Sequence, residues 1–166
     1  MKLVIAPNTI LKSKAAEWAF LCDQDYTNAE TVEKEMIELM LASNGIGLAA
    51  NQVGLIERVF AIQLANGQQL CMFNPKVLAT SDNMQLGQEG CLSFPNLWLD
   101  IERPYSIVAE YLDKTAKECT ITLSGIDARC FLHELDHLDG ICFTEKTSAL
   151  KLALAKKKQQ KKRKFV

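Results

Sequence analysis

Two histidines occur among the 166 residues of this chain, and both lie in the sequence His133-Glu134-Leu135-Asp136-His137. Imidazoles four residues apart on an α-helix are rotated by about 40° and separated by roughly 6 Å, so both can bind one cation. Glu134 would then lie beside the metal, where a carboxylate can transfer protons. The pattern indicates a metal site with a general base, although the same five residues also suit a solvated helix surface.

The residues before this motif favour the metal site. A helix is expected to begin after Gly125 and to end at Gly140. One face of this helix holds Ile126, Cys130, His133 and His137, and a second apolar stripe holds Ala128, Phe131, Leu135 and Leu138. A helix with two such faces is buried, and buried histidines need partners, which a cation with charged ligands provides.

A mononuclear catalytic site uses three protein ligands and leaves one position for water. No third histidine exists, and the carboxylates of Asp139 and Glu145 have no convincing spacing from the motif. The remaining candidates are Cys22, Cys71, Cys91, Cys119, Cys130 and Cys142. Cys91 stands out among them because Gly87 and Gly90 punctuate its extended segment and allow close backbone approach.

Three motifs, in the same order, resemble those of the peptide deformylase family. Residues 45–52 (GIGLAANQ) resemble its GxGLAAxQ motif, residues 89–93 its EGCLS motif, and residues 133–137 its HExDH motif. The resemblance implies a hydrolase that removes the formyl group from the initiator methionine of nascent polypeptides. It also implies one divalent metal per chain, natively Fe(II), with Zn, Ni or Co as alternatives in a purified sample.

The resemblance assigns roles to individual residues. The implied metal ligands are Cys91, His133 and His137. Glu134 would act first as general base and then as general acid. The side-chain amide of Gln52 and the backbone N–H of Leu92 would stabilise the oxyanion of the tetrahedral intermediate. For Gln52 alone, hydrogen bonding to the backbone is the simpler interpretation.

The same resemblance implies a substrate pocket. Gly47 would let the substrate backbone pair with its loop, and the slot for the methionine side chain would be lined by Ile46, Ile126 and Cys130. These three side chains could equally serve ordinary core packing. Arg129 is charged where an apolar residue would be expected, so one part of the pocket rim stays undefined. Trp98 could form the floor of the peptide cleft, but we favour packing at a hydrophobic edge.

An ion pair is expected behind the metal ligands. Metal-binding histidines commonly donate their second nitrogen to an outer layer of polar groups. Asp136 and Arg103 are the candidates for a pair that fixes this geometry. The alternative is that Asp136 lies on the surface without a specific role.

Composition and periodicity predict the fold class. With 48% hydrophobic and 23% charged residues, the chain can form one domain with a sizeable core. A helix is expected at 28–43, a hairpin turn at Asn66-Gly67, and extended segments at 58–65, 69–78, 105–113 and 118–124. These elements predict an α+β fold in which mainly antiparallel sheets pack around a central HExxH-bearing helix. The catalytic domain would cover residues 1–147.

The Lys-rich C-terminal helix or tail, residues 148–166, differs in charge from the rest of the chain. Eight of the 19 basic residues follow position 150 and no acidic residue does, so the first 150 residues carry 11 basic and 20 acidic side chains. A helix is expected at 148–158, with fraying from Gln159 onward. A basic end favours a polyanion, and the family resemblance suggests ribosomal RNA. The alternative is a solvated, solubilising tail.

Other features bear on location and assembly. No apolar stretch approaches the ~20 residues needed to span a membrane, and the N-terminal apolar run is too short for a secretory signal. We therefore expect a cytoplasmic protein with reduced thiols and no membrane partner. No sequence feature indicates an interface, so a monomer is expected.

Two rival functions fit parts of the sequence. A metalloprotease would share the HExxH motif, but the lack of a third histidine or a well-spaced glutamate argues against it. A catalytically inactive, ribosome-binding relative with a structural metal would share the basic tail. The presence of Glu134, Gln52 and Cys91 argues against that second function.

Overall fold

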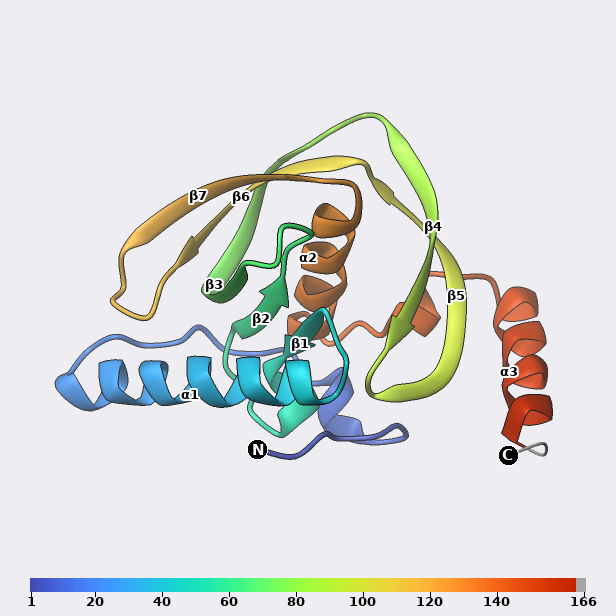
Figure 1. Cartoon of the computed structure of the whole chain (residues 1–166), viewed down its shortest axis with the longest axis horizontal. Helices are drawn as coiled ribbons and strands as arrows, with labels where there is room; N and C mark the ends of the chain where they lie inside the picture. The colour runs from blue at the N-terminus through green and yellow to red at the C-terminus, as the bar shows by residue number, and fades with distance from the viewer. Residues whose placement is uncertain (164–166) are drawn as a thin grey trace.

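The structure, a computed structural model, describes residues 1–163 (Figure 1). Its α-helices are α1 (Asp23–Ala42), α2 (Gly125–Leu138) and α3 (Ala149–Arg163), and its 3-10 helices are η1 (Thr9–Lys12), η2 (Ala50–Val53) and η3 (Phe143–Glu145). The strands are β1 (Gly47–Ala49), β2 (Val59–Gln63), β3 (Gln69–Thr80), β4 (Met84–Cys91), β5 (Phe94–Pro104), β6 (Ser106–Leu112) and β7 (Glu118–Ser124).

The strands form two antiparallel sheets. The larger sheet has the order β1-β2-β3-β6-β7, and β4 pairs with β5 in a separate two-stranded ribbon. Figure 1 shows α2 between the larger sheet and this ribbon. The predicted α+β architecture, with antiparallel sheets around the HExxH-bearing helix, is therefore confirmed.

Local sequence accounts for several element boundaries. The carboxylate of Asp25 accepts hydrogen bonds from the backbone N–H groups of Leu21 and Cys22, which caps α1 five residues earlier than the sequence predicts. The expected turn at Asn66-Gly67 connects β2 to β3, with Gly67 in a left-handed conformation. The segment around Cys91, now β4, was expected to be extended, but β5 was not expected, although inward-facing residues alternate along it.

The main core lies between α2, α1 and the larger sheet. The ring of Phe131 on α2 meets the ring of Phe60 on β2 edge to face, with centroids 5.1 Å apart. Met36 and Met40 of α1 are fully buried in the same cluster. This cluster packs against the side of α2 that faces away from the ribbon. It therefore sets the rotation of the helix and keeps the face with His133 and His137 turned toward the ribbon.

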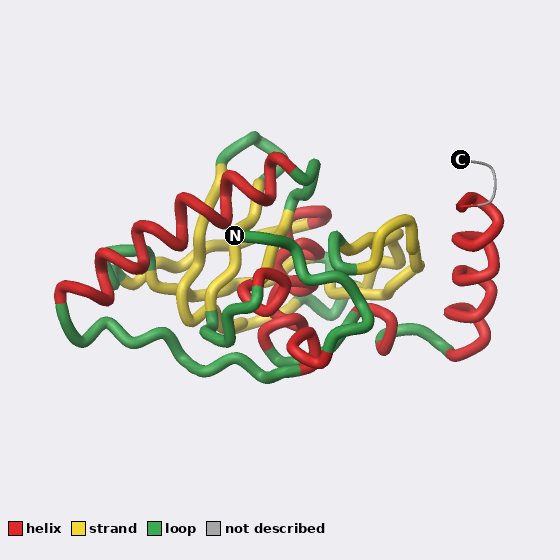
Figure 2. The backbone as a smooth tube through the Cα atoms, turned by 90° about the horizontal axis from the view of Figure 1, so that it is seen from below, coloured by secondary structure: helices red, strands yellow, loops and turns green. Residues whose placement is uncertain are grey.

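A second, smaller cluster supports the ribbon. It consists of Leu97, Leu99, Ile101 and Phe143, with Leu152 and Ala155 of α3 packed against it. Figure 2 shows α3 at one end of the molecule. The helix continues to Arg163, so the predicted fraying at Gln159 is wrong: the Gln159 side chain donates a hydrogen bond to the carbonyl of Pro95 at 2.6 Å. None of the described helices is long and apolar enough to cross a bilayer.

Replacing Phe131 should test how firmly α2 is held. Phe131→Ala removes a fully buried ring and its contact with Phe60, so we expect the free energy of unfolding to fall by about 3–5 kcal/mol. Urea denaturation of the two proteins measures this difference. Leu21→Ala, at an exposed position, is the control and should change the free energy little.

Candidate active site

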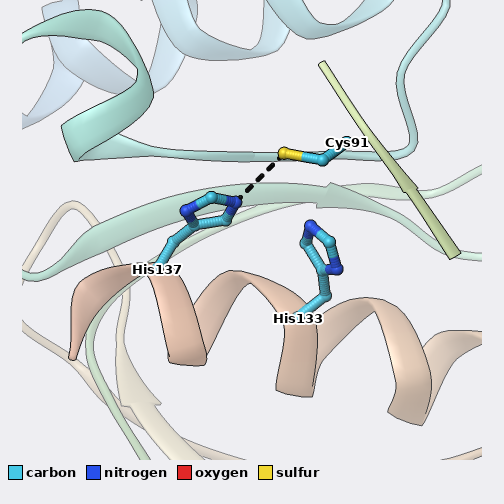
Figure 3. Close-up of side chains that lie close together, drawn as sticks. All are labelled: Cys91, His133 and His137. Carbon is cyan, nitrogen blue, oxygen red and sulfur yellow. Dashed lines mark hydrogen bonds between the residues drawn. The ribbon is translucent and has the colours of Figure 1, made fainter. Parts of the chain in front are cut away.

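Three possible metal ligands converge from two elements. His133 and His137 project from α2 toward Cys91 at the end of β4 (Figure 3). The Sγ atom of Cys91 lies 3.2 Å from Nε2 of His137, and one potential ligand atom from each residue lies within 4.8 Å of the others. The four-residue spacing brings the two imidazoles together, whereas Cys91 arrives through the tertiary fold.

The donor set fits a divalent cation. A cysteine sulfur and two imidazole nitrogens are common ligands of divalent metal ions, and here these three atoms lie within 4.8 Å of one another. Burial and the charge of His133 lower the pKa of His137 to about 3, which keeps this imidazole neutral. Burial would lower the pKa of His133, yet hydrogen bonds to Cys91 and Glu89 raise it to about 10. The surroundings of His133 therefore stabilise positive charge, which a cation bound in place of the imidazole proton would also supply.

A buried carboxylate lies behind the ligands. Glu89 Oε2 is 2.9 Å from Nδ1 of His133, while both oxygens of Glu89 accept hydrogen bonds from Arg103 at 2.6 and 2.9 Å. Burial alone would raise the pKa of Glu89, but hydrogen bonds from His133 and Arg103 hold it at about 2. This ionised carboxylate leaves Nε2 of His133 directed toward Cys91.

Arg103 extends this network to the helix. Its Nη1 donates to Oδ2 of Asp136 at 2.8 Å, so the pair expected from the sequence lies where it was placed. Asp136 also meets Lys146 at 2.9 Å, and its side chain is only 14% exposed. The alternative of a surface aspartate without a specific role is therefore wrong.

Glu134 faces the inside of the site. Its side chain is buried, and burial raises the pKa of its carboxyl group to about 7, against the lowering effect of His133. Its Oε2 atom has no hydrogen-bond partner among the described residues. A desolvated carboxyl group with one unpartnered oxygen and a pKa near neutrality suits proton transfer.

Gln52 points its amide at the ligands. The side-chain oxygen accepts from the backbone N–H of Ala49 at 2.9 Å, which leaves the amide nitrogen to face Cys91 Sγ at 3.3 Å and Ser93 Oγ at 3.1 Å. Gln52 thus bonds the backbone and also presents two N–H donors to the site. Leu92, which carries the other expected oxyanion donor, lines the same cavity.

A cavity of about 470 Å³ opens beside these groups. Its lining includes Ile46, Gly47, Gln52, Leu92, Ile126, Cys130, His133 and Glu134. Ile46 and Ile126 are 47% and 50% exposed, so the alternative of core packing is wrong for both. Cys130 is buried, belongs to the main core and lines the cavity as well.

Trp98 also lines the cavity, where its ring packs over Gly90 and remains 55% exposed. The expected edge packing is therefore not what the structure shows. Arg129, at the position that left the rim undefined, is buried and bonds Glu89 Oε1 at 2.8 Å. The sequence reasoning assigned no role to Glu89, and the only signal for one was its place in the EGCLS motif.

Comparisons with known proteins agree with this fold and site. The family model described as "Polypeptide deformylase" matches residues 1–153. A peptide deformylase of Wolbachia sp. subsp. Brugia malayi is 36% identical over 97% of this chain and 94% of its own length. Peptide deformylase 2 of Vibrio cholerae is 37% identical over the same shares.

Solved structures give the same result. The Synechococcus elongatus peptide deformylase in complex with actinonin is 32% identical, with a TM-score of 0.86 over 96% of this chain and 86% of the other. The Ehrlichia chaffeensis peptide deformylase, also in complex with actinonin, is 33% identical, with a TM-score of 0.86 over 98% of this chain and 96% of the other.

The fold and the Cys/His/His cluster define a metal-dependent hydrolase. The chain belongs to the peptide deformylase family, as its motifs suggested. It is an enzyme of protein biosynthesis that removes the N-formyl group from nascent polypeptides. The metalloprotease and the inactive relative are accordingly set aside.

Gly47 gives a direct test of the site. A Cβ atom at this position would overlap the Glu134 carboxylate and lie 2.8 Å from Cys130 Sγ. Gly47→Ala should therefore displace the carboxylate and lower kcat/KM for a formyl peptide by about 10²-fold, with the fold retained. Formate release measures this loss. Gly54→Ala strains a left-handed residue but meets no atom within 4 Å, so it controls for lost stability and should keep its activity.

Proposed function

We propose that Cys91, His133 and His137 hold one divalent cation, natively Fe(II), and that Zn, Ni or Co can replace it in purified protein. The convergence of these three side chains within 4.8 Å is the observation that carries the proposal. When bound, the cation would supply Lewis acidity, which polarises the formyl carbonyl and acidifies water. The substrate is an N-formylmethionyl peptide.

Glu134 is the proton carrier in this proposal. Its carboxylate takes a proton from the attacking water and then gives that proton to the departing amine. The raised pKa of Glu134, caused by its burial, supports both steps because the group can gain and lose a proton near neutral pH. Its unpartnered Oε2 is free to face the reacting atoms.

Gln52 and Leu92 stabilise the oxyanion in this proposal. The Gln52 amide is held by its acceptor contact with Ala49 and by its donation to Ser93, so only the N–H group that faces Cys91 Sγ would change partner to meet the oxyanion. The backbone N–H of Leu92 is the second donor. Two fixed donors in a site shielded from water stabilise developing charge more strongly than exposed ones would.

Substrate selectivity rests on the apolar side of the cavity. Ile46 and Ile126 at the mouth and Cys130 deeper inside receive the methionine side chain. Gly47 offers its backbone to the substrate because no side chain intervenes at this position. The formyl group alone provides little binding area, so this apolar contact would determine KM.

Glu134→Gln separates chemistry from metal binding. The amide keeps the size of the side chain but cannot accept a proton, so we expect turnover to fall by about 10²–10⁴-fold or more with metal content unchanged. Cys91→Ala should lose the metal itself. Formate release from formyl-Met-Ala-Ser and metal analysis under anaerobic conditions measure both effects. Full activity of Glu134→Gln would refute the assigned role.

The basic helix α3 is proposed to contact ribosomal RNA. Leu152 and Ala155 pack against the small cluster, while Lys156, Lys157 and Lys158 are exposed. A docked helix holds these charges in a fixed arrangement, which suits a phosphate backbone. This contact would keep the enzyme in the cytoplasm beside emerging chains.

Charge removal from α3 tests this contact. Changing Lys156, Lys157 and Lys158 together to Gln should weaken ribosome binding and flatten its salt dependence, because fewer counterions are released. Hydrolysis of a free formyl peptide should not change. The matched control changes three exposed lysines elsewhere, Lys2, Lys34 and Lys117, to Gln. Equal weakening in both triple variants would contradict a specific role for α3.

A further inference from the structure

Arg129 is a buried guanidinium that the proposed chemistry does not use. It projects from α2, one turn before His133, and is 6% exposed. Its Nη1 donates to Oε1 of Glu89 at 2.8 Å and to the carbonyls of Ile101 at 2.8 Å and Gly87 at 3.3 Å. Its Nη2 donates to the carbonyl of Gln85 at 2.6 Å. All four acceptors belong to the β4–β5 ribbon.

These hydrogen bonds join two parts of the metal site. The ribbon carries Cys91 at the end of β4, and α2 carries both histidines. A two-stranded ribbon is marginally stable by itself, so its position depends on what it packs against. Gly87 and Ile101 face each other in the ribbon, and Arg129 contacts the carbonyls of both. The guanidinium therefore holds both strands of the ribbon to the helix.

Arg103 makes the complementary connection. It lies on β5 and reaches Asp136 on α2, whereas Arg129 lies on α2 and reaches β4 and β5. Both guanidinium groups bond the same oxygen, Oε1 of Glu89. The Glu89 carboxylate consequently touches two arginines and His133, and the loss of one arginine would leave it bonded but free to shift.

Gly87 provides the space for this contact. A Cβ atom at Gly87 would lie 2.8 Å from Cζ and Nη2 of Arg129, closer than real Cβ atoms approach other atoms. The guanidinium thus lies directly against the backbone of β4. Both terminal nitrogens of Arg129 already donate to protein acceptors, which argues against a role in binding the charged end of a substrate.

We propose that Arg129 is a positioning residue that sets the distance between the Cys91 thiolate and the two histidines. It acts through Glu89 and through the ribbon carbonyls, and it controls how long the cation stays bound. The inference rests on the proposed metal site formed by Cys91, His133 and His137. Partners in this outer layer typically change metal affinity by about 10–100-fold.

Metal release measures this role without recourse to activity. Co(II)-loaded wild type is mixed with excess chelator, and the loss of thiolate-to-Co(II) absorption gives the release rate. Arg129→Met keeps the length of the side chain but donates no hydrogen bonds, so we expect release to be about 10–100-fold faster. Arg129→Lys restores the charge without the planar set of donors and should fall between the two proteins.

Arg58→Met is the matched control. Arg58 also ties the end of α2 to the sheet region, through the capping residue Asp139 at 2.7 Å, but among the described residues its side chain forms no hydrogen bond or ion pair with the ribbon. Its loss should lower the melting temperature of the metal-free protein and leave the Co(II) release rate unchanged. If Arg129→Met released Co(II) at the wild-type rate but had a lower melting temperature, the role of Arg129 would be merely structural and the proposal would be overturned.

Gly87→Ala provides an independent variant in case Arg129→Met does not fold. Its methyl group should displace the guanidinium and speed Co(II) release. In the double variant Gly87→Ala/Arg129→Lys, the increase in release rate should be smaller than the product of the two single-variant increases, because both changes break the same contact. Strict multiplicativity would contradict the shared contact. If wild-type protein showed no thiolate-to-Co(II) absorption, the metal site itself would be refuted. If wild type bound Co(II) normally and the variants released it at the wild-type rate, only the role of Arg129 would be refuted.

Discussion

The buried carboxylate of Glu89 is the interaction on which the site depends. An ionised group in the interior is costly unless charged partners surround it, and here Arg103, Arg129 and His133 do so. These partners come from β5 and α2, so the carboxylate can be satisfied only when ribbon and helix are in place. The same contacts that stabilise the charge therefore bring together Cys91, His133 and His137, the proposed metal ligands.

The arrangement separates rigid support from reactive groups. Glu89 is fully partnered, with a pKa held near 2 by its hydrogen bonds despite burial, and it stays ionised throughout neutral pH. Glu134, nearby, is equally buried but lacks such partners, and burial raises its pKa to about 7. Two buried glutamates thus differ in pKa because one is bonded to two arginines and the other has no such partners.

The sequence predicts the local parts of this site better than the distant ones. The histidine pair follows from a four-residue spacing on one helix, and four of the five strands of the larger sheet, all except β1, follow from periodicity and an Asn-Gly turn. The contacts of Glu89 with Arg103 and Arg129 span 14 and 40 residues, so no local pattern reports them. The positions of Trp98 and α3 likewise depend on tertiary packing, which periodicity does not encode.

Four glycines allow large side chains to pack directly against the backbone around the cavity. None of them has a positive φ, so their value lies in missing side chains rather than in unusual backbone conformation. Each has a larger side chain against its Cα, in the pairs Gly45 with Leu92, Gly47 with Glu134, Gly87 with Arg129, and Gly90 with Trp98. The carboxylate, the guanidinium and the indole can approach the strands only because no Cβ opposes them. Small residues in the β1 and β4 segments thus determine where the large functional residues lie.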